Sequence, residues 1–348
     1  MTRRNVRRAA VLLPVVGLLA TACNSGGGGG SSASGGGENC YEGETANFVV
    51  PFSPGGGYDT IARGIAPYLE KELGADAVVV QNEPGAGGLT AANNLFAAKP
   101  DGLTFGLFAA QGVVGASIAE AAGTSYDPEK FTYVARLAED ARVLLASPKS
   151  GITSVEDLQS GDSFQYATSG VGAADHVDAN VVPTILDIQD KIKIVTGFEG
   201  SSETELAVTS GQVDLGSGTL GTRIAGIESG DQVPVLLMGR ERAEDLPDVP
   251  ALLELDLDNP DLAEAYIGLQ EVGRSVFAPP DLDENCLSQL QEGLQNVLDD
   301  KDFQDKIAGS VDVPFEYTSG EELKKAVDRV LDAPPELVDL LKKAYAGQ

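Results

Sequence analysis

Three consecutive glycines, Gly55 to Gly57, separate a strand-like run from a helix-like run near the start of this 348-residue chain. Residues 46–50 end in two valines and favour a strand, and apolar residues then recur at helical spacing. The helical positions are Ile61, Ile65, Leu69 and Leu73. A glycine loop before a helix can direct its own N–H groups, and the unpaired N–H groups of the helix start, at one small anion. We therefore predict a carboxylate cradle. The alternative is a flexible connector with Asp59 in the first helical turn.

The first residues have the pattern of an export signal. Basic residues at positions 3, 4, 7 and 8 precede an apolar run over residues 9–20, and small residues precede Cys23. Residues 1–22 resemble a bacterial lipoprotein signal, with cleavage before Cys23 and lipid on its thiol. An ordinary secretory signal is the alternative. Residues 24–37 are mostly glycine and serine, so we expect residues 23–45 to form a lipidated tether on the outer face of the bacterial cell membrane.

Two cysteines remain once Cys23 carries lipid. Cys40 and Cys286 would lie in an oxidising compartment, where a pair is more often bridged than free. We therefore predict a Cys40–Cys286 disulfide that ties the start of the fold to a late segment. Two buried or free thiols are the alternative.

Acidic residues strongly outnumber basic ones. The chain has 53 acidic and 24 basic residues, a formal net charge of −29. Such a chain is repelled by nucleic acid and by anionic lipid, so we expect membrane contact through the lipid anchor only and no nucleic-acid partner. The charge indicates a solvated outer face and still permits a local anion site, because salt screens distant charges.

Short apolar runs alternate with helical stretches along the rest of the chain. The later strand candidates are residues 77–81, 103–108, 131–137, 143–146, 164–167, 192–195, 213–215 and 233–237. This alternation predicts an α/β fold with mostly parallel sheets flanked by helices. We expect two lobes joined by crossing segments. Lobe 1 would comprise residues 46–141 and 275–348, and lobe 2 would comprise residues 142–274.

A second strand, loop and helix unit opens the second lobe. The strand candidate at residues 164–167 precedes a loop of small residues from Thr168 to Ala173, and a helical stretch follows. Because α/β folds bind ligands beyond the carboxyl ends of their strands, the two loops are expected to face each other across a cleft. The glycines at residues 84–88 lack the spacing of a dinucleotide site, and we interpret them as structural.

Catalytic and metal-binding patterns are scarce. The single histidine, His176, belongs to no zinc-protease, nucleophile-elbow or phosphate-loop motif. With two cysteines in a bridge, the chain cannot build a common zinc site. We interpret His176 as a structural helix or cleft residue, and we expect no enzyme activity, no metal and no cofactor. A glycosidase-like carboxylate pair stays open by counting, although the chain has no tryptophan to stack on sugars.

Several motifs, taken in order, resemble one family. They are residues 50–59 (VPFSPGGGYD), Asn82 with residues 84–88 (PGAGG), residues 100–104 (PDGLT), residues 172–176 (GAADH), residues 211–214 (GQVD) and residues 246–250 (LPDVP). From about residue 47 onward the chain resembles the substrate-binding proteins of tripartite tricarboxylate transporters, the Bug-type receptors. The resemblance implies a two-lobed Venus-flytrap fold that captures a small organic acid and delivers it to a two-subunit membrane permease. We expect a monomer.

The resemblance also implies which residues hold the ligand. In lobe 1 these are Phe52, Ser53, Pro54, Gly55, Gly56, Gly57, Asp59 and Gln111, and in lobe 2 they are Thr168, Ser169, Gly170, Gly172, Ala173, Phe198, Gly200 and Ser217. The glycine N–H groups would take the anion, while Asp59 would order the first loop or meet a donor group on the ligand.

Two departures from the family leave the ligand open. The family commonly has Tyr-Lys-Gly where this chain has Phe198-Glu199-Gly200, which removes a positive charge and adds a negative one. Glu199 in the cleft would oppose a second carboxylate or attract an ammonium group, and Glu199 pointing to solvent is the alternative. The loop at residues 172–176 also lacks the hydroxyl residue expected after its glycine.

The sequence therefore predicts a lipid-anchored, extracytoplasmic solute-binding protein for a small organic carboxylate or a similarly small polar metabolite. One alternative is a receptor that presents its ligand to a membrane sensor kinase. The other is a secreted hydrolase that uses an acidic cleft.

Overall fold

The structure is a computed structural model, and it describes residues 39–347 except 199, 309, 310 and 312. The predicted signal, the predicted lipid attachment at Cys23 and the departure at Glu199 lie outside the described residues. Residues 38–348 form one compact unit.

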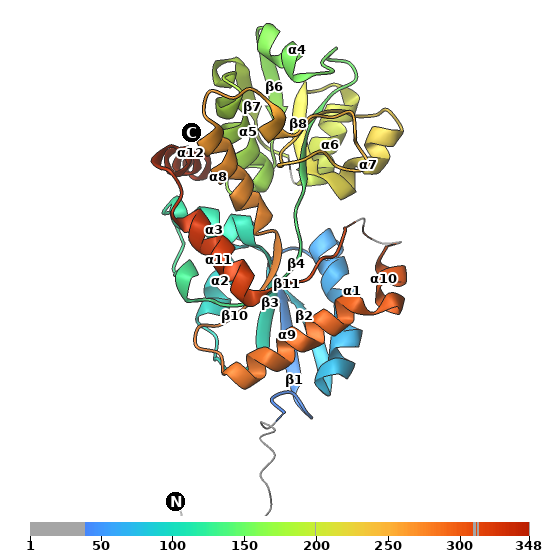
Figure 1. Cartoon of the computed structure of the whole chain (residues 1–348), viewed down its shortest axis with the longest axis vertical. Coiled ribbons are helices and arrows are strands. Elements are labelled where there is room, and N and C mark those ends of the chain that lie inside the picture. The colour runs from blue at the N-terminus through green and yellow to red at the C-terminus, as the bar shows by residue number, and fades with distance from the viewer. Residues whose placement is uncertain (1–38, 199, 309–310, 312, 348) are drawn as a thin grey trace, which may run out of the picture. The chain divides into compact units, whose positions relative to one another are not determined.

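Two sheets carry this unit (Figure 1). Sheet 1 has the order β11-β4-β10-β3-β1-β2, and sheet 2 has the order β7-β6-β8-β5-β9. The strands of sheet 1 are β1 (Thr45–Val50), β2 (Ala77–Asn82), β3 (Thr104–Ala109), β4 (Thr132–Ala138), β10 (Arg274–Ala278) and β11 (Thr318–Ser319). The strands of sheet 2 are β5 (Arg142–Ala146), β6 (Phe164–Ala167), β7 (Ile192–Val195), β8 (Leu215–Thr219) and β9 (Val233–Leu237). We use lobe 1 and lobe 2 for the parts of the chain built on sheet 1 and sheet 2.

Helices surround both sheets. They are α1 (Gly57–Leu73), α2 (Leu89–Phe96), α3 (Ala110–Ile118), α4 (Val155–Ser160), α5 (Ala174–Ile185), α6 (Ser201–Ser210), α7 (Leu220–Glu228), α8 (Pro260–Glu271), α9 (Glu284–Asp299), α10 (Lys301–Ile307), α11 (Gly320–Leu331) and α12 (Pro335–Ala346). Short 3-10 turns cover Ala86–Gly88, Pro128–Lys130, Gln189–Lys191 and Leu252–Glu254.

Both sheets are mixed, so the prediction of mostly parallel sheets is wrong in that detail. In sheet 1, β1 pairs in parallel with β2 and β3, but β10 runs antiparallel to β3 and β4. In sheet 2, β6 pairs in parallel with β7 and β8, but β5 runs antiparallel to β8 and β9. The physical reason is the crossing of the chain between sheets. After β4 the chain passes directly into β5, and it returns from β9 through α8 into β10. Strands β5 and β10 therefore each enter their sheet from the other sheet, and not by a helical crossover from a parallel neighbour of the same sheet.

Helix α1 forms where the apolar spacing predicts it. Ile61, Ile65, Leu69 and Leu73 are all buried. The helix packs on β2 and α9, and it ends at Gly74, whose left-handed backbone (φ 67°) closes the last turn. This packing fixes the N-terminus of α1 directly after the glycine loop.

Two helices contact elements of both lobes. Helix α12 packs on α5 of lobe 2 and on α3 of lobe 1, and α8 packs on α5, α3 and α11. The sequence-based limits placed all of residues 275–348 in lobe 1. They therefore missed that α12 covers an apolar face of lobe 2 as well.

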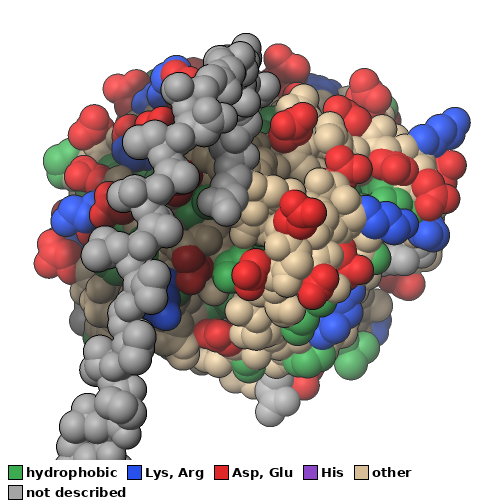
Figure 2. Space-filling model, turned by 90° about the horizontal axis from the view of Figure 1, so that it is seen from below, with side chains coloured by type: hydrophobic (Ala, Val, Ile, Leu, Met, Phe, Trp, Pro, Cys, Tyr) green, Lys and Arg blue, Asp and Glu red, His purple; other side chains and the backbone are tan. Residues whose placement is uncertain are grey.

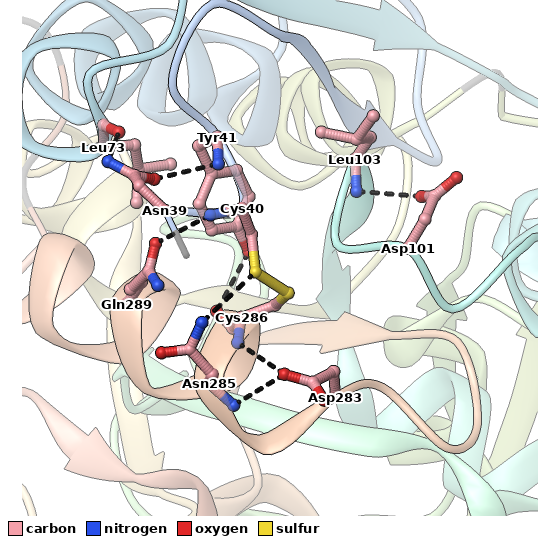
Figure 3. Close-up of a disulfide and its surroundings, with 10 residues drawn as sticks. All are labelled: Asn39, Cys40, Tyr41, Leu73, Asp101, Leu103, Asp283, Asn285, Cys286 and Gln289. Atoms are coloured by element: carbon pink, nitrogen blue, oxygen red, sulfur yellow. Dashed lines mark hydrogen bonds between the residues drawn. A yellow bond between two sulfur atoms is a disulfide. The ribbon is translucent and has the colours of Figure 1, made fainter. Parts of the chain in front are cut away.

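The folded part begins earlier than predicted. Cys40 and Cys286 form a disulfide with Cα atoms 5.5 Å apart, and the backbone N–H of Cys40 donates to Gln289 (Figure 3). Tyr41 is fully buried, and its hydroxyl donates to the carbonyl oxygen of Cys286 at 3.1 Å. The tether limit at residue 45 is therefore too late, because burial of Tyr41 and the bridge hold these residues on lobe 1.

Acidic side chains are common on the face of the molecule drawn in Figure 2. The face in Figure 2 carries more Asp and Glu side chains than Lys and Arg, as the charge balance leads one to expect. No helix within the described part of the chain has both the length and the apolar character needed to cross a membrane.

Candidate functional site

A cleft of about 770 Å³ is lined by residues of both lobes. Lobe 1 contributes Phe52, Ser53, Pro54, Gly55, Gly56, Gly57, Tyr58, Gly87, Ala109, Gln111, Gly112 and the crossing residue Asp140. Lobe 2 contributes Arg142, Ser169, Gly172, Ala173, Ala174, Asp175, Gly200, Ser201, Ser202, Glu203, Ser217, Gly218 and Thr219. The lobes approach each other closely at one point, because a Cβ atom on Gly87 would lie 3.5 Å from the carbonyl oxygen of Gly172.

Five helices begin at this cleft. Their N-cap residues are Gly56 of α1, Ala109 of α3, Ala173 of α5, Gly200 of α6 and Thr219 of α7, and all five line the cleft. None of these five side chains caps its own helix: four are Gly or Ala, and the Thr219 hydroxyl donates to Asp140 instead. The first N–H groups of these helices therefore lack the usual side-chain partner.

Helices elsewhere in the described chain are mostly capped. Ser154, Asn259, Asp283, Asp300 and Ser319 accept hydrogen bonds from the first backbone N–H groups of α4, α8, α9, α10 and α11. Helices α2 and α12 lack such a cap. At the cleft, by contrast, the helix N-termini and their positive dipole ends remain available to bind an anion.

The buried carboxylate of Asp59 holds the glycine loop in place through hydrogen bonds. One oxygen accepts from the backbone N–H of Gly55 at 2.8 Å and from Arg63 at 3.0 Å, and the other accepts from Asn82 at 2.9 Å. Asn82 also donates to the carbonyl oxygen of Phe52, so it ties both ends of the loop to β2. The Arg63 hydrogen bond, helped by those from Gly55 and Asn82, lowers the pKa of Asp59 to about 2. Asp59 is buried and does not line the cleft, so its contacts fit the first of its two predicted roles, the ordering of the loop.

The lobe 2 loop is organised by a second carboxylate. Asp175 accepts from the backbone N–H and the hydroxyl of Ser169, at 2.9 and 2.6 Å. Thr168 and His176 are buried beneath the loop, where the Thr168 hydroxyl and His176 Nδ1 are 3.0 Å apart. Burial lowers the pKa of His176, so the ring is neutral at pH 7 and belongs to the packing of the loop.

A third buried carboxylate, Asp140, lies on the short segment that passes from β4 of lobe 1 to β5 of lobe 2. It accepts hydrogen bonds from both lobes at the cleft. Asp140 accepts from Gln111 at 3.0 Å and from Arg274 at 3.3 Å, both in lobe 1, and from Thr219 of lobe 2 at 2.9 Å. Burial favours the neutral acid, but the nearby Arg274 and Arg142 outweigh it, and the pKa of Asp140 is lowered. Asp140 is therefore ionised at neutral pH, with partners on both sides of the crossing.

A second buried ion pair lies next to it in lobe 2. Arg142 Nε donates to Asp178 at 2.7 Å, and Asp178 also accepts from the hydroxyls of Ser217 and Tyr266, each at 2.6 Å. Asp178 is fully buried. Because Tyr266 belongs to α8, this network connects sheet 2 to the helix that contacts both lobes. A smaller cavity of about 380 Å³ shares Asp140 and Arg142 with the cleft.

The structure brings most of the predicted ligand residues to the cleft. The exceptions are Asp59, Thr168, Gly170 and Phe198, which do not line it. Phe198 packs instead in a small cluster with Ala207 and Val208. Predictions from sequence missed Tyr58, Gly87, Ala109, Gly112, Asp140, Arg142, Ala174, Asp175, Ser201, Ser202, Glu203, Gly218 and Thr219. Several of these residues lie next to the start of a helix. A helix start with glycine or alanine at the N-cap position was the sequence signal that could have identified them.

Comparison with known proteins gives a consistent result. The family described as "Tripartite tricarboxylate transporter family receptor" matches residues 61–332. A protein encoded in the ttuE-ttuC′ intergenic region of Agrobacterium vitis is 25% identical over 283 residues, 80% of this chain and 78% of that protein. BugT of Bordetella pertussis is 24% identical and covers 62% of this chain and 67% of its own length.

Solved structures share the two-lobed fold. MatC from Rhodopseudomonas palustris, with bound malate, is 26% identical with a TM-score of 0.67, over 86% of this chain and 99% of MatC. The periplasmic binding protein BugD is 25% identical with a TM-score of 0.66, over 87% of this chain and 98% of BugD. The family match spans well over half of the chain, and so the chain belongs to the tripartite tricarboxylate transporter family of receptors.

Proposed function

We propose that this receptor captures a small organic carboxylate in the cleft between its lobes and delivers it to a two-subunit membrane permease. The observation that carries the proposal is the convergence of five helix N-termini without side-chain caps on one cleft. Such a cleft offers backbone N–H groups and positive dipole ends to an anion. An anionic ligand can therefore be held although the chain as a whole is strongly acidic.

The relatives support this ligand class. MatC is described with bound malate, a small organic acid. Members of the family are receptors and not enzymes, so the hydrolase alternative is dropped. Delivery to a permease is part of the proposal, and it is supported by the transporter named in the family description. Attachment through lipid on Cys23, on the outer face of the cell membrane, is part of the proposal and rests on the signal-like start of the sequence.

Binding is expected to close the lobes. A carboxylate held by Gly56 and Gly57 of lobe 1 would also meet the starts of α5 and α6 of lobe 2. A ligand that contacts both lobes binds the closed form more tightly and shifts the population toward it.

A thermal-shift screen of the purified protein tests the ligand class. The panel comprises mono-, di- and tricarboxylates, aromatic acids, amino acids and amines of similar size. A ligand at 100 times its Kd stabilises the folded state by about 2.7 kcal/mol, which is readily detected. Stabilisation by acids but not by simple amines supports the proposal. A protein stabilised by none of the acids, or by amines alone, would contradict it.

Gly56 allows a sharper test. Its φ of −80° suits proline, and a Cβ atom there would lie 3.7 Å from the nearest atom, the Ser53 carbonyl oxygen. Gly56→Pro removes the N–H group, whereas the matched control Gly56→Ala adds a Cβ atom and keeps that group. A hydrogen bond to a charged group contributes about 1.5–3 kcal/mol, so we expect Gly56→Pro to weaken acid binding roughly 10- to 100-fold. Equal Kd values for the two variants in calorimetry would argue against the cradle.

A further inference from the structure

One buried carboxylate at the cleft has no counterion among the described residues. The acidic side chains buried in the described part of the chain are Asp59, Asp140, Asp175 and Asp178. Three of them pair with an arginine: Asp59 with Arg63, Asp140 with Arg274, and Asp178 with Arg142. Asp175 forms no ion pair with any described residue. Both of its hydrogen bonds, from Ser169, go to Oδ2, and Oδ1 has no partner there.

The surroundings of Asp175 do not replace the missing cation. Arg142 and Arg223 act on it electrostatically, but they are paired with Asp178 and Glu205. Asp175 lies in the first turn of α5, whose N-terminus supplies only a partial positive charge, about half an elementary charge. With 7% of its surface exposed, Asp175 is also poorly solvated by water. Burial of an unpaired carboxylate is costly, so a position of this kind favours a cationic partner.

A residue of lobe 1 that lines the same cleft holds a second acceptor without a partner among the described residues. Gln111 is 5% exposed, its amide nitrogen donates to Asp140, and its carbonyl oxygen Oε1 has no partner among the described residues. Gln111 and Asp175 both line the cleft. Each lobe thus contributes to the cleft one buried side chain with an acceptor atom that has no partner among the described residues, neutral in Gln111 and carboxylate in Asp175.

We propose that the natural ligand carries an ammonium group as well as a carboxylate, and that Asp175 and Gln111 recognise the ammonium group. This inference rests on the proposed function, because it assigns the carboxylate to the uncapped helix starts. An ammonium group has three N–H donors and a full positive charge, so it can satisfy both acceptors and neutralise Asp175. A hydroxyl group would satisfy Gln111 but leave the charge of Asp175 unpaired. Rotation about the last torsion of the Asp175 side chain, which is soft, lets either oxygen face the ligand.

Matched ligand pairs test this assignment. Calorimetry compares alanine with propionate, aspartate with succinate and glutamate with glutarate, so that each pair differs by one ammonium group. For the pair that binds, we expect the amino acid to bind at least about 30-fold more tightly, the factor that corresponds to loss of one partner of a buried charge pair. The variant Asp175→Asn is expected to abolish most of that preference. The control Asp245→Asn makes the same change at an exposed carboxylate, and we expect this variant to retain the preference for the amino acid.

The outcomes separate this inference from the proposed function. If plain acids bind as tightly as their amino counterparts, the ammonium assignment is overturned and carboxylate binding stands. If neither kind of compound binds, the proposed function itself fails. A preference for amino acids that survives in Asp175→Asn would remove Asp175 from the recognition site. Thermal unfolding of each variant without ligand shows whether it is folded, and the preference of the unmodified protein is measured independently of any variant.

Discussion

At the scale of single residues, Asp59 offers a test of how the glycine loop is held. In Asp59→Asn the side chain would place an NH₂ group against the donors Gly55, Arg63 or Asn82, and at least one hydrogen bond would be lost. We expect the free energy of unfolding at pH 7 to fall by about 1–2 kcal/mol, less than the full pKa shift would give because Arg63 is half exposed. Urea unfolding of Asp59→Asn, with the exposed Asp76→Asn as control, measures this.

The same carboxylate makes a pH-dependent contribution. Its pKa is about 2 in the folded protein and 3.8 as an ordinary value, so the folded state favours the charged form. The contribution is therefore complete above about pH 4 and is lost as the pH falls toward 2. We expect the stability difference between the unmodified protein and Asp59→Asn to disappear over this window. A difference that stays constant down to pH 2 would show that the carboxylate charge is not its cause.

Some site residues could be predicted from the sequence and others could not, for physical reasons. Gly55 to Gly57 stand out because consecutive glycines between a strand and a helix are rare and have a clear use. Asp140, Arg142 and Arg274 look in the sequence like ordinary charged residues at strand ends. Only the crossing of the chain between two sheets brings them together and buries them with each other. Pairings between segments so far apart in sequence leave no local pattern.

At the scale of elements, the disulfide connects the segment before β1 to α9. Cys40 and Cys286 are 246 positions apart, so the bridge strongly restricts the unfolded chain. We expect the double variant Cys40→Ser, Cys286→Ser to lose about 2–4 kcal/mol of unfolding free energy. Urea unfolding with and without reductant measures this, and reductant should destabilise the unmodified protein but not the variant. Equal free-thiol counts in denatured protein with and without reductant would contradict the bridge.

The limits of strands with continuous apolar sequence were predicted closely, and the limits of a strand made of small and polar residues were not. The strands β6, β7 and β9 have the residue limits that their apolar sequence predicts. Strand β8, predicted at residues 213–215, instead covers Leu215–Thr219, a segment with two glycines, a serine and a threonine. The glycine at 218 is required by packing, since a Cβ atom there would lie 2.2 Å from Nε of the buried Arg223. Pairing with β5 on one side and β6 on the other, and not local propensity, makes this stretch a strand.

At the scale of the whole molecule, the contacts between the lobes extend beyond the crossing strands. Helix α12 packs on α3 and α5, and its Tyr345 hydroxyl donates to the carbonyl oxygen of Gly112 at 3.0 Å. A Cβ atom built on Gly172, in the loop before α5 of lobe 2, would lie 3.7 Å from the Tyr345 ring. One aromatic side chain therefore contacts both lobes beside the cleft, and its removal should let them move more freely relative to each other.

Spin labels on the two lobes test this expectation. Labels at Asp76→Cys in lobe 1 and Asp190→Cys in lobe 2, both exposed, report the distribution of distances between the lobes. We expect Tyr345→Ala to broaden this distribution in the unliganded protein, because it removes both the packing and the hydrogen bond. Tyr345→Phe keeps the ring and loses a hydrogen bond of about 1 kcal/mol, so it should broaden the distribution less. An identical distribution of distances in Tyr345→Ala would mean that Tyr345 does not restrict the lobes. The connections from β4 to β5 and from α8 to β10 would then limit their relative motion.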